Sequence, residues 1–175
     1  MKKLDLQLFA EPVTGKKIFY LYRILKEAST TNAQGIAFTS ENGRSVSVES
    51  ESTVTKDGAV RTPGTPEIEI TATSYLAKGD TLIERLEEAQ LNSDVVEIWE
   101  GNMEEPVENA EDKFKGTYYQ GYLTGFEKTS SAEGYTEISL TFGINGTGKK
   151  GNVTVTAEEQ EIADYMFVDT QKKPA

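Results

Sequence analysis

Residues 41–73 read ENGRSVSVESESTVTKDGAVRTPGTPEIEITAT, and this stretch decides the fold. Its first part, from Glu41 to Arg61, is a polar ribbon that reverses at Lys56-Asp57-Gly58. Asp-Gly supplies the positive φ that a tight hairpin turn needs. Because the ribbon has few apolar side chains, it cannot be held by a core of its own. We expect an exposed hairpin arm over about residues 41–62, which is either mobile or docked on another surface.

The rest of the stretch changes character. Pro63-Gly64-Thr65-Pro66 is a cluster of turn residues and predicts a turn. In the following segment, strict alternation places Ile68, Ile70 and Ala72 on one face and acidic and hydroxyl side chains on the other. This pattern predicts a half-buried strand.

Further strands are expected on both sides of this stretch. Aromatic and branched residues predict a strand buried on both faces at 16–26, and others at 95–100, 113–127, 135–142, around Val153 and Val155, and at 165–168. In the run 135–142, Ile138, Leu140 and Phe142 face inward. Leu4, Leu6 and Leu8 alternate like a short strand in an N-terminal arm. Residues 101–112 read as an acidic loop, and residues 157–164 as a helical turn.

One convincing helix is predicted at about 80–91. Thr81 to Glu84 has the spacing of a capping box, and Leu82, Leu86 and Ala89 fall on one side. About eight strands with one flanking helix predict a mainly β fold, an antiparallel sandwich or barrel. We expect one domain over residues 14–170, between an N-terminal arm of residues 1–13 and a flexible C-terminal tail of residues 171–175.

Composition excludes several kinds of chemistry. The 175 residues include no histidine and no cysteine, which removes Ser-His-Asp and Cys-His catalysis, thiolate zinc sites and disulfides. The net charge of −11 repels phosphate, so sequence-reading of nucleic acid is not expected. Asp5 and Gln7 interrupt the apolar start, so we expect no signal peptide. No other run approaches the roughly twenty apolar residues of a membrane helix.

Three motifs have plainer explanations than catalysis. Residues 143–150 nearly match a phosphate-binding loop, but Lys150 stands where Ser or Thr must bind magnesium, and a strand follows, so a Gly-rich hairpin loop explains them better. The acidic residues 104–112 lack the spacing of a calcium loop. Carboxylates such as Glu67 and Glu69 merely share one face of a strand. We therefore predict no catalytic, metal or cofactor site.

Aromatic side chains are concentrated in the run 113–127. A sugar or nucleic-acid stacking platform is one reading of them, and ordinary core and subunit contact is the commoner one. The acidic balance and the lack of a basic groove favour core and contact. The residues are Phe114, Tyr118, Tyr119, Tyr122 and Phe126.

Several segments, in their order and spacing, resemble one family. They are Lys17–Arg23, Thr55–Gly64, Val96–Trp99, Phe114–Thr124 and Leu140–Gly143. The family is the major tail proteins of long, non-contractile-tailed bacteriophages of Gram-positive hosts. The resemblance runs from about Gly15 to Thr170 and does not include the first eleven or so residues.

This resemblance implies a tail-tube fold, with six copies per ring whose sheets join into a continuous inner barrel, and with rings stacked into the tube of the virion tail. It implies assembly in the host cytoplasm, enclosure of a tape-measure protein, and later passage of double-stranded DNA to the host. Expected partners are copies of the chain itself, the tape-measure protein, and tail terminator and distal tail proteins, with no membrane.

Two sets of residues are candidates for this function. A polar arm makes sense if it docks on the adjacent ring, and a negative lumen would repel the DNA backbone during passage. Candidates for the arm contact are Arg44, Glu49, Glu51, Lys56, Asp57 and Arg61; candidates for the lumen are Glu67, Glu69, Glu127 and Glu137, with Glu49 and Glu51 as further possibilities.

Three other functions stay open at this point. The tube protein of a contractile tail or a secretion machine would share the fold and the mode of assembly. A monomeric carbohydrate-binding or adhesin sandwich could use Trp99 or the tyrosines for stacking. A hydrolase with two carboxylates would need a pair with defensible geometry, and no such pair is evident.

Overall fold

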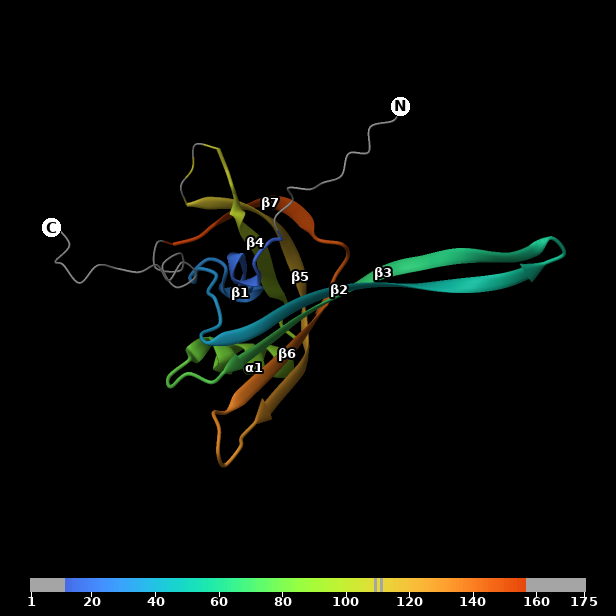
Figure 1. Ribbon diagram of the computed structural model, residues 1–175. Coiled ribbons are helices and arrows are strands. Elements are labelled where there is room, and N and C mark those ends of the chain that lie inside the picture. The colour runs from blue at the N-terminus through green and yellow to red at the C-terminus, as the bar shows by residue number, and fades with distance from the viewer. Residues whose placement is uncertain (1–11, 109, 111, 157–175) are drawn as a thin grey trace.

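The computed structural model describes residues 12–108, 110 and 112–156, which form a seven-stranded antiparallel sheet with one α-helix (Figure 1). The elements in chain order are β1 Ile18–Ile24, β2 Thr39–Thr55, β3 Gly58–Tyr75, α1 Thr81–Asn92, β4 Val96–Pro106, β5 Lys113–Thr129, β6 Glu137–Ile144 and β7 Lys149–Thr154. The strands pair in the order β1-β4-β5-β6-β3-β2, and β7 pairs with the first part of β5. The mainly β, antiparallel class with one flanking helix is confirmed.

The sheet curls until its two ends face each other. Although β4 and β5 separate β1 from β6 in the sheet, the ring of Tyr22 in β1 stacks on that of Phe142 in β6, with 5.3 Å between centroids. The Tyr22 hydroxyl also donates to Asn42 Oδ1 in β2 at 3.2 Å. At Gly121 a Cβ would lie 2.2 Å from the Gly143 carbonyl oxygen, so only glycine lets β5 and β6 approach here.

The main core fills the space inside this curl. Ile138, Leu140 and Phe142 are buried there, as the alternation predicts, and Ile68, Ile70 and Ala72 of β3 pack with them. Helix α1 closes the core with a buried set that contains the predicted Leu82, Leu86 and Ala89 and also Ile83. Apolar burial of this kind supplies most of the stability of a domain that has no disulfide.

A smaller cluster lies on the other face of β1, β4 and β5. Leu21, Phe114, Val153 and Val155 are buried in it, and Trp99 packs against its edge. Since Tyr22 and Ile24 of β1 face the main core, β1 is covered on both sides. The prediction of a strand buried on both faces is confirmed.

Helix α1 begins differently from the prediction. Its N-cap is Asp80, whose Oδ1 accepts hydrogen bonds from the backbone N–H of Leu82 and Ile83 at 3.0 and 3.3 Å. Thr81 is already the first helical residue, so the capping-box assignment is wrong by one position. An aspartate is as good a cap as threonine and adds a negative charge at the positive end of the helix.

The hairpin of β2 and β3 is longer than predicted. Every residue from 45 to 67 is exposed, and this part, which we call the arm, projects from the other described residues, which we call the body (Figure 1). The predicted turn at 63–66 is wrong, because β3 continues through it with a bulge opposite Glu49. Prolines are tolerated here because β3 pairs only with β2 along the arm, so one edge needs no donor.

Two predicted loops are also corrected. β4 runs on to Pro106, so half of the predicted acidic loop 101–112 is strand. The Gly-rich segment after β6 is not a hairpin loop, because β7 pairs with β5 and not with β6. The predicted elements at 4–8, 157–164 and 165–168, and nearly all of the predicted N-terminal arm and the whole C-terminal tail, lie outside the described residues.

Candidate assembly surfaces

One face of β2, β3, β5 and β6 carries an acidic surface that no other element of the described residues covers. Since Ile68, Ile70 and Ile138 point into the core, their neighbours Glu67, Glu69 and Glu137 point away from it. Glu127 lies opposite Ser139 of β6 and therefore shares this face. The strands bring together all four carboxylates that the sequence suggested for a lumen, and we call this surface the acidic face.

The rest of the acidic face carries small polar residues and two half-exposed tyrosines, Tyr75 opposite Glu137 and Tyr122 opposite Gly143. In register beside the carboxylates lie Ser45 and Ser47 of β2, Thr71 of β3, and Ser139 and Thr141 of β6. Along these described strands, none of the outward-facing positions at this level is lysine or arginine. The surface is negative, weakly apolar and without cations that could hold a phosphate.

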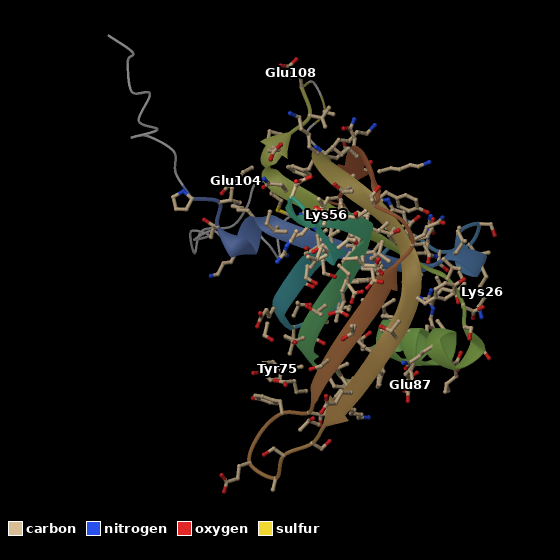
Figure 2. All side chains as sticks on the ribbon, turned by 90° about the vertical axis from the view of Figure 1, so that its right-hand side faces the viewer. Lys26, Lys56, Tyr75, Glu87, Glu104 and Glu108 are labelled. Carbon is tan, nitrogen blue, oxygen red and sulfur yellow. The ribbon has the colours of Figure 1, made fainter. Side chains whose placement is uncertain are left out.

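The arm carries most of the residues suggested for a contact between rings. Lys56 and Asp57 form its two-residue turn, and Gly58 has the positive φ of 129° that the sequence predicted there. Glu49 and Glu51 lie on the side of the arm that continues the acidic face, because the extra residue of the bulge is on β3 and β2 keeps its alternation from Ser45 and Ser47. Figure 2 looks along the arm and labels Lys56 near its tip.

Arg44 lies at the base of the arm and joins it to the body. Its Nε donates to Glu100 Oε2 of β4 at 2.8 Å, and the Tyr20 hydroxyl donates to the same oxygen at 3.1 Å. Burial, and then the charge of Glu100, raise the pKa of Tyr20, so its hydroxyl remains a donor. These contacts fix the direction in which the arm leaves the body.

Two strand edges flank the acidic face and are unpaired within the described residues. β2 ends the sheet and pairs only with β3 along its 17 residues. β5 pairs with β4 only up to Gly121, so the part from Tyr122 to Thr129 has β6 on one side and an open edge on the other. Open edges of this length are pairing sites for another chain.

Sequence reasoning missed a buried ion pair on the side of β4 that points away from the main core. Glu97 of β4 accepts hydrogen bonds from Arg23 Nε of β1 and from the Tyr118 hydroxyl of β5, both at 2.7 Å. The Arg23 guanidinium lies 5.0 Å from the ring centroid of Trp99. Three strands far apart in sequence meet here, so no local pattern could reveal it, and both Glu97 oxygens are occupied in structural contacts.

Neither a metal-binding group nor a membrane-spanning helix is found in the part of the chain that the structure describes. There, no group of three or more histidine, cysteine, aspartate or glutamate residues is placed to hold a metal ion. No helix in the same residues is long and apolar enough to cross a membrane. Residues 149–154, after the loop that resembles a phosphate site, form strand β7 rather than a helix that could bind phosphate.

The sequence model of the family described as phage tail tube protein matches residues 12–150. A protein of Staphylococcus phage phiMR25, described as a candidate tail protein, is 29% identical over 154 residues, which is 86% of this chain and 80% of that protein. The tail tube protein of Bacillus phage SPP1 is 25% identical over 148 residues. That alignment covers 85% of this chain and 55% of the SPP1 protein, so the chain spans about half the length of that relative.

Solved structures show the same fold. A hybrid solid-state NMR and cryo-EM structure of the SPP1 tail tube superposes with a TM-score of 0.71 at 24% identity, over 92% of each chain. The tail of an empty gene transfer agent particle, computed with helical refinement and C6 symmetry, gives a TM-score of 0.55 at 16% identity, over 80% of this chain and 98% of that chain. At these identities the likeness concerns the fold alone.

Proposed function

We propose a structural, self-assembling function for this chain, because it belongs to the phage tail tube protein family. Copies of the chain polymerise as stacked hexameric rings into the tail tube of the virion. During assembly in the host cytoplasm the tube encloses a tape-measure protein, and later it conducts double-stranded DNA to the host. Tail terminator and distal tail proteins bind its two ends.

The observation that carries this proposal is the pair of open edges beside the acidic face. In the order β5-β6-β3-β2 every neighbour is antiparallel, so β2 runs opposite to β5. When β2 of one copy pairs with the Tyr122–Thr129 edge of β5 in the next, the joined sheet remains antiparallel. Such a contact is heterologous, and repeated rotation closes it into a ring. The C6 symmetry of the gene transfer agent tail supports six copies.

The acidic face is the lumen of this tube. When sheets join edge to edge into a closed barrel, bulky packed elements fit outside and a bare face lies inside. Here the core, α1 and β1 cover one face, and no element among residues 12–108, 110 and 112–156 covers the face with Glu67, Glu69, Glu127 and Glu137. A negative wall repels the phosphates of DNA and keeps the passing duplex from binding.

The arm makes the contact between rings. Its residues have no core, and an ordered two-stranded ribbon of this length gains stability by docking on another surface. From the Val46 and Ile68 pair to the tip, the ribbon reaches roughly 30 Å beyond the body, at about 3.3 Å per residue. That reach is enough to overlap a subunit in the adjacent ring.

Negative-stain electron microscopy with light scattering, on the purified chain over a concentration series, tests the proposal. We expect hollow tubes or stacked rings above a critical concentration. A monodisperse monomer at every concentration, also after addition of a purified tail tip, would contradict self-polymerisation.

The lumen assignment has a separate test on assembled tubes. Cationic gold clusters small enough to enter the tube are expected to line the inside of wild-type tubes. Tubes with Glu67, Glu69, Glu127 and Glu137 all changed to Gln should lose this lining. The matched control changes Glu84, Glu87 and Glu88 of α1 to Gln and should keep it. If gold lines the inside of both kinds of variant tube equally, the acidic face does not form the lumen.

A further inference from the structure

Exposed apolar side chains gather at two places along the β2–β3 hairpin. On the arm, Val46 is 53% exposed, Val48 47% and Val54 84%. Beside the other end of the hairpin, Phe38 is 71% exposed, Tyr75 42% and Tyr135 82%. Apolar surface of this extent on a soluble subunit marks contact sites.

The apolar residues of the arm form one stripe. Cross-strand pairing places Val46 opposite Ile68, Val48 opposite Pro66, Ser50 opposite Pro63 and Val54 opposite Ala59. Directly opposite residues share a face, so this valine–proline stripe continues the core-facing side of the sheet outward. Arg61, opposite Ser52, is the charged residue on the stripe, while Glu49 and Glu51 lie on the other face.

The aromatic residues at the far end form a compact group, which we call the end cluster. The rings of Tyr75 and Tyr135 are 5.9 Å apart, and the Phe38 carbonyl accepts a hydrogen bond from the Tyr75 backbone N–H at 3.2 Å. Beside them lies a hollow of about 530 Å³. Its apolar lining includes Leu76, Phe126 and Tyr135, and its charged lining consists of Lys78, Asp80, Glu84, Glu87 and Lys128. Figure 2 labels Tyr75 at the lower end of the sheet, away from the Lys56 tip.

We propose that the valine–proline stripe of one copy docks on the end cluster of the copy in the next ring. This inference rests on the proposed function, since it names the surfaces that join the rings. Stacking rings head to tail is a heterologous contact, so each copy needs two different, complementary surfaces at opposite axial ends. The arm tip and the end cluster are separated by the 18 residues of β3, roughly 60 Å of strand.

Charge also selects the stripe over the charged residues of the arm as the docking side of the arm. Every copy has the same net charge of −11, so bringing copies together through carboxylates costs electrostatic repulsion. The stripe has no carboxylate, and valine and proline pack well on aromatic rings. Burial of the stripe therefore drives docking, and the arm carboxylates stay in solvent.

The first test replaces the stripe without changing its shape. Threonine has the volume and strand propensity of valine, so Val46→Thr with Val48→Thr should leave the exposed arm folded. Loss of two buried methyl contacts is expected to raise the critical concentration for tubes roughly tenfold or more, by light scattering. The matched control, Val60→Thr, makes the same change on the other face of the arm, opposite Thr53, and should not raise it. Wild-type assembly of the double threonine variant would overturn the inference.

The second test identifies the receiving surface and uses the absence of cysteine in the chain. A Val48→Cys variant is mixed with a Tyr135→Cys variant, assembled, and treated with a short bismaleimide; Val46→Cys and Val54→Cys are tested likewise. We expect a cross-linked dimer in tubes and none in monomers below the critical concentration. Each variant alone is the control.

The outcomes separate this inference from the proposed function. Tubes without a dimer from any of the three valine positions would overturn the docking assignment and leave the tube function standing. A cross-link within one chain, in the Val48→Cys and Tyr135→Cys double variant as a monomer, would also overturn it, because the stripe would then fold back on its own subunit. Failure of the wild-type chain to form tubes at all would contradict the proposed function itself.

Discussion

Phe142 in β6 and Val54 in β2 are both apolar residues of antiparallel strands, yet Phe142 has no exposed surface and Val54 is 84% exposed. Around Phe142 the sheet curls and α1 closes it, so each strand of the body is held by side chains from several others. Along the arm, β2 and β3 pair only with each other within the part of the chain that the structure describes. The body therefore contains the packing that the chain needs to fold, and we propose that the arm supplies the contact between rings.

The largest effect on this comparison should come from Phe142→Ala. The ring is buried and stacked on Tyr22, so its removal leaves a cavity where the two ends of the sheet meet. We expect a loss of about 3–5 kcal/mol in the free energy of unfolding, measured by urea titration of the monomer. Val54→Ala in the arm is the control and should cost less than about 0.5 kcal/mol. Similar losses at both positions would break the division between body and arm.

A smaller effect is expected from Tyr22→Phe, which leaves Asn42 without its donor and should cost about 1 kcal/mol at pH 7. Burial raises the pKa of Tyr22 above its ordinary 10.0. Unfolding therefore lets this tyrosine ionise above pH 10, and the stability that it contributes falls as the pH rises. The difference between wild type and Tyr22→Phe should shrink from pH 9 to pH 11 in urea titrations. A constant difference would show that the hydroxyl is not shielded by the curl.

An effect of similar size, confined to one end of the body, concerns the cap of α1. Asp80→Ala removes the acceptor for two backbone N–H groups and should cost about 1 kcal/mol, measured by thermal unfolding of the monomer. Thr81→Ala is the matched control, and it should change stability by less than about 0.5 kcal/mol because Thr81 is inside the helix. A larger loss of stability for Thr81→Ala than for Asp80→Ala would instead support the capping box that the sequence suggested.

Sequence patterns predicted the body well wherever the signal is local. Ile68, Ile70 and Ala72, and likewise Ile138, Leu140 and Phe142, are buried as predicted. In a strand with one buried face, apolar residues at every second position can all be buried only if that set faces the core. The contact of Tyr22 with Phe142 could not be predicted, because it depends on how far the sheet bends. The same applies to Glu97, whose partners come from two other strands.

The errors in the arm and its surroundings have a different cause. Pro63 and Pro66 are strong turn residues, and they remain in a strand because that strand has no second neighbour along the arm. The carboxylates Glu67, Glu69, Glu127 and Glu137 could be proposed as a set from the sequence, but only the register of three strands places them on one face. Their orientation toward a lumen remains a proposal.

Excision of the arm tests the central claim most directly. Residues 47–67 are replaced by Asn-Gly, so that the paired Val46 and Ile68 flank a two-residue hairpin turn. Urea unfolding and sedimentation of tubes are measured on the same preparation of this variant, with wild type measured in parallel. We predict a free energy of unfolding within about 1 kcal/mol of wild type and no tubes at any concentration. Tubes at the wild-type critical concentration, or a chain that no longer folds, would contradict the division of folding and assembly between body and arm.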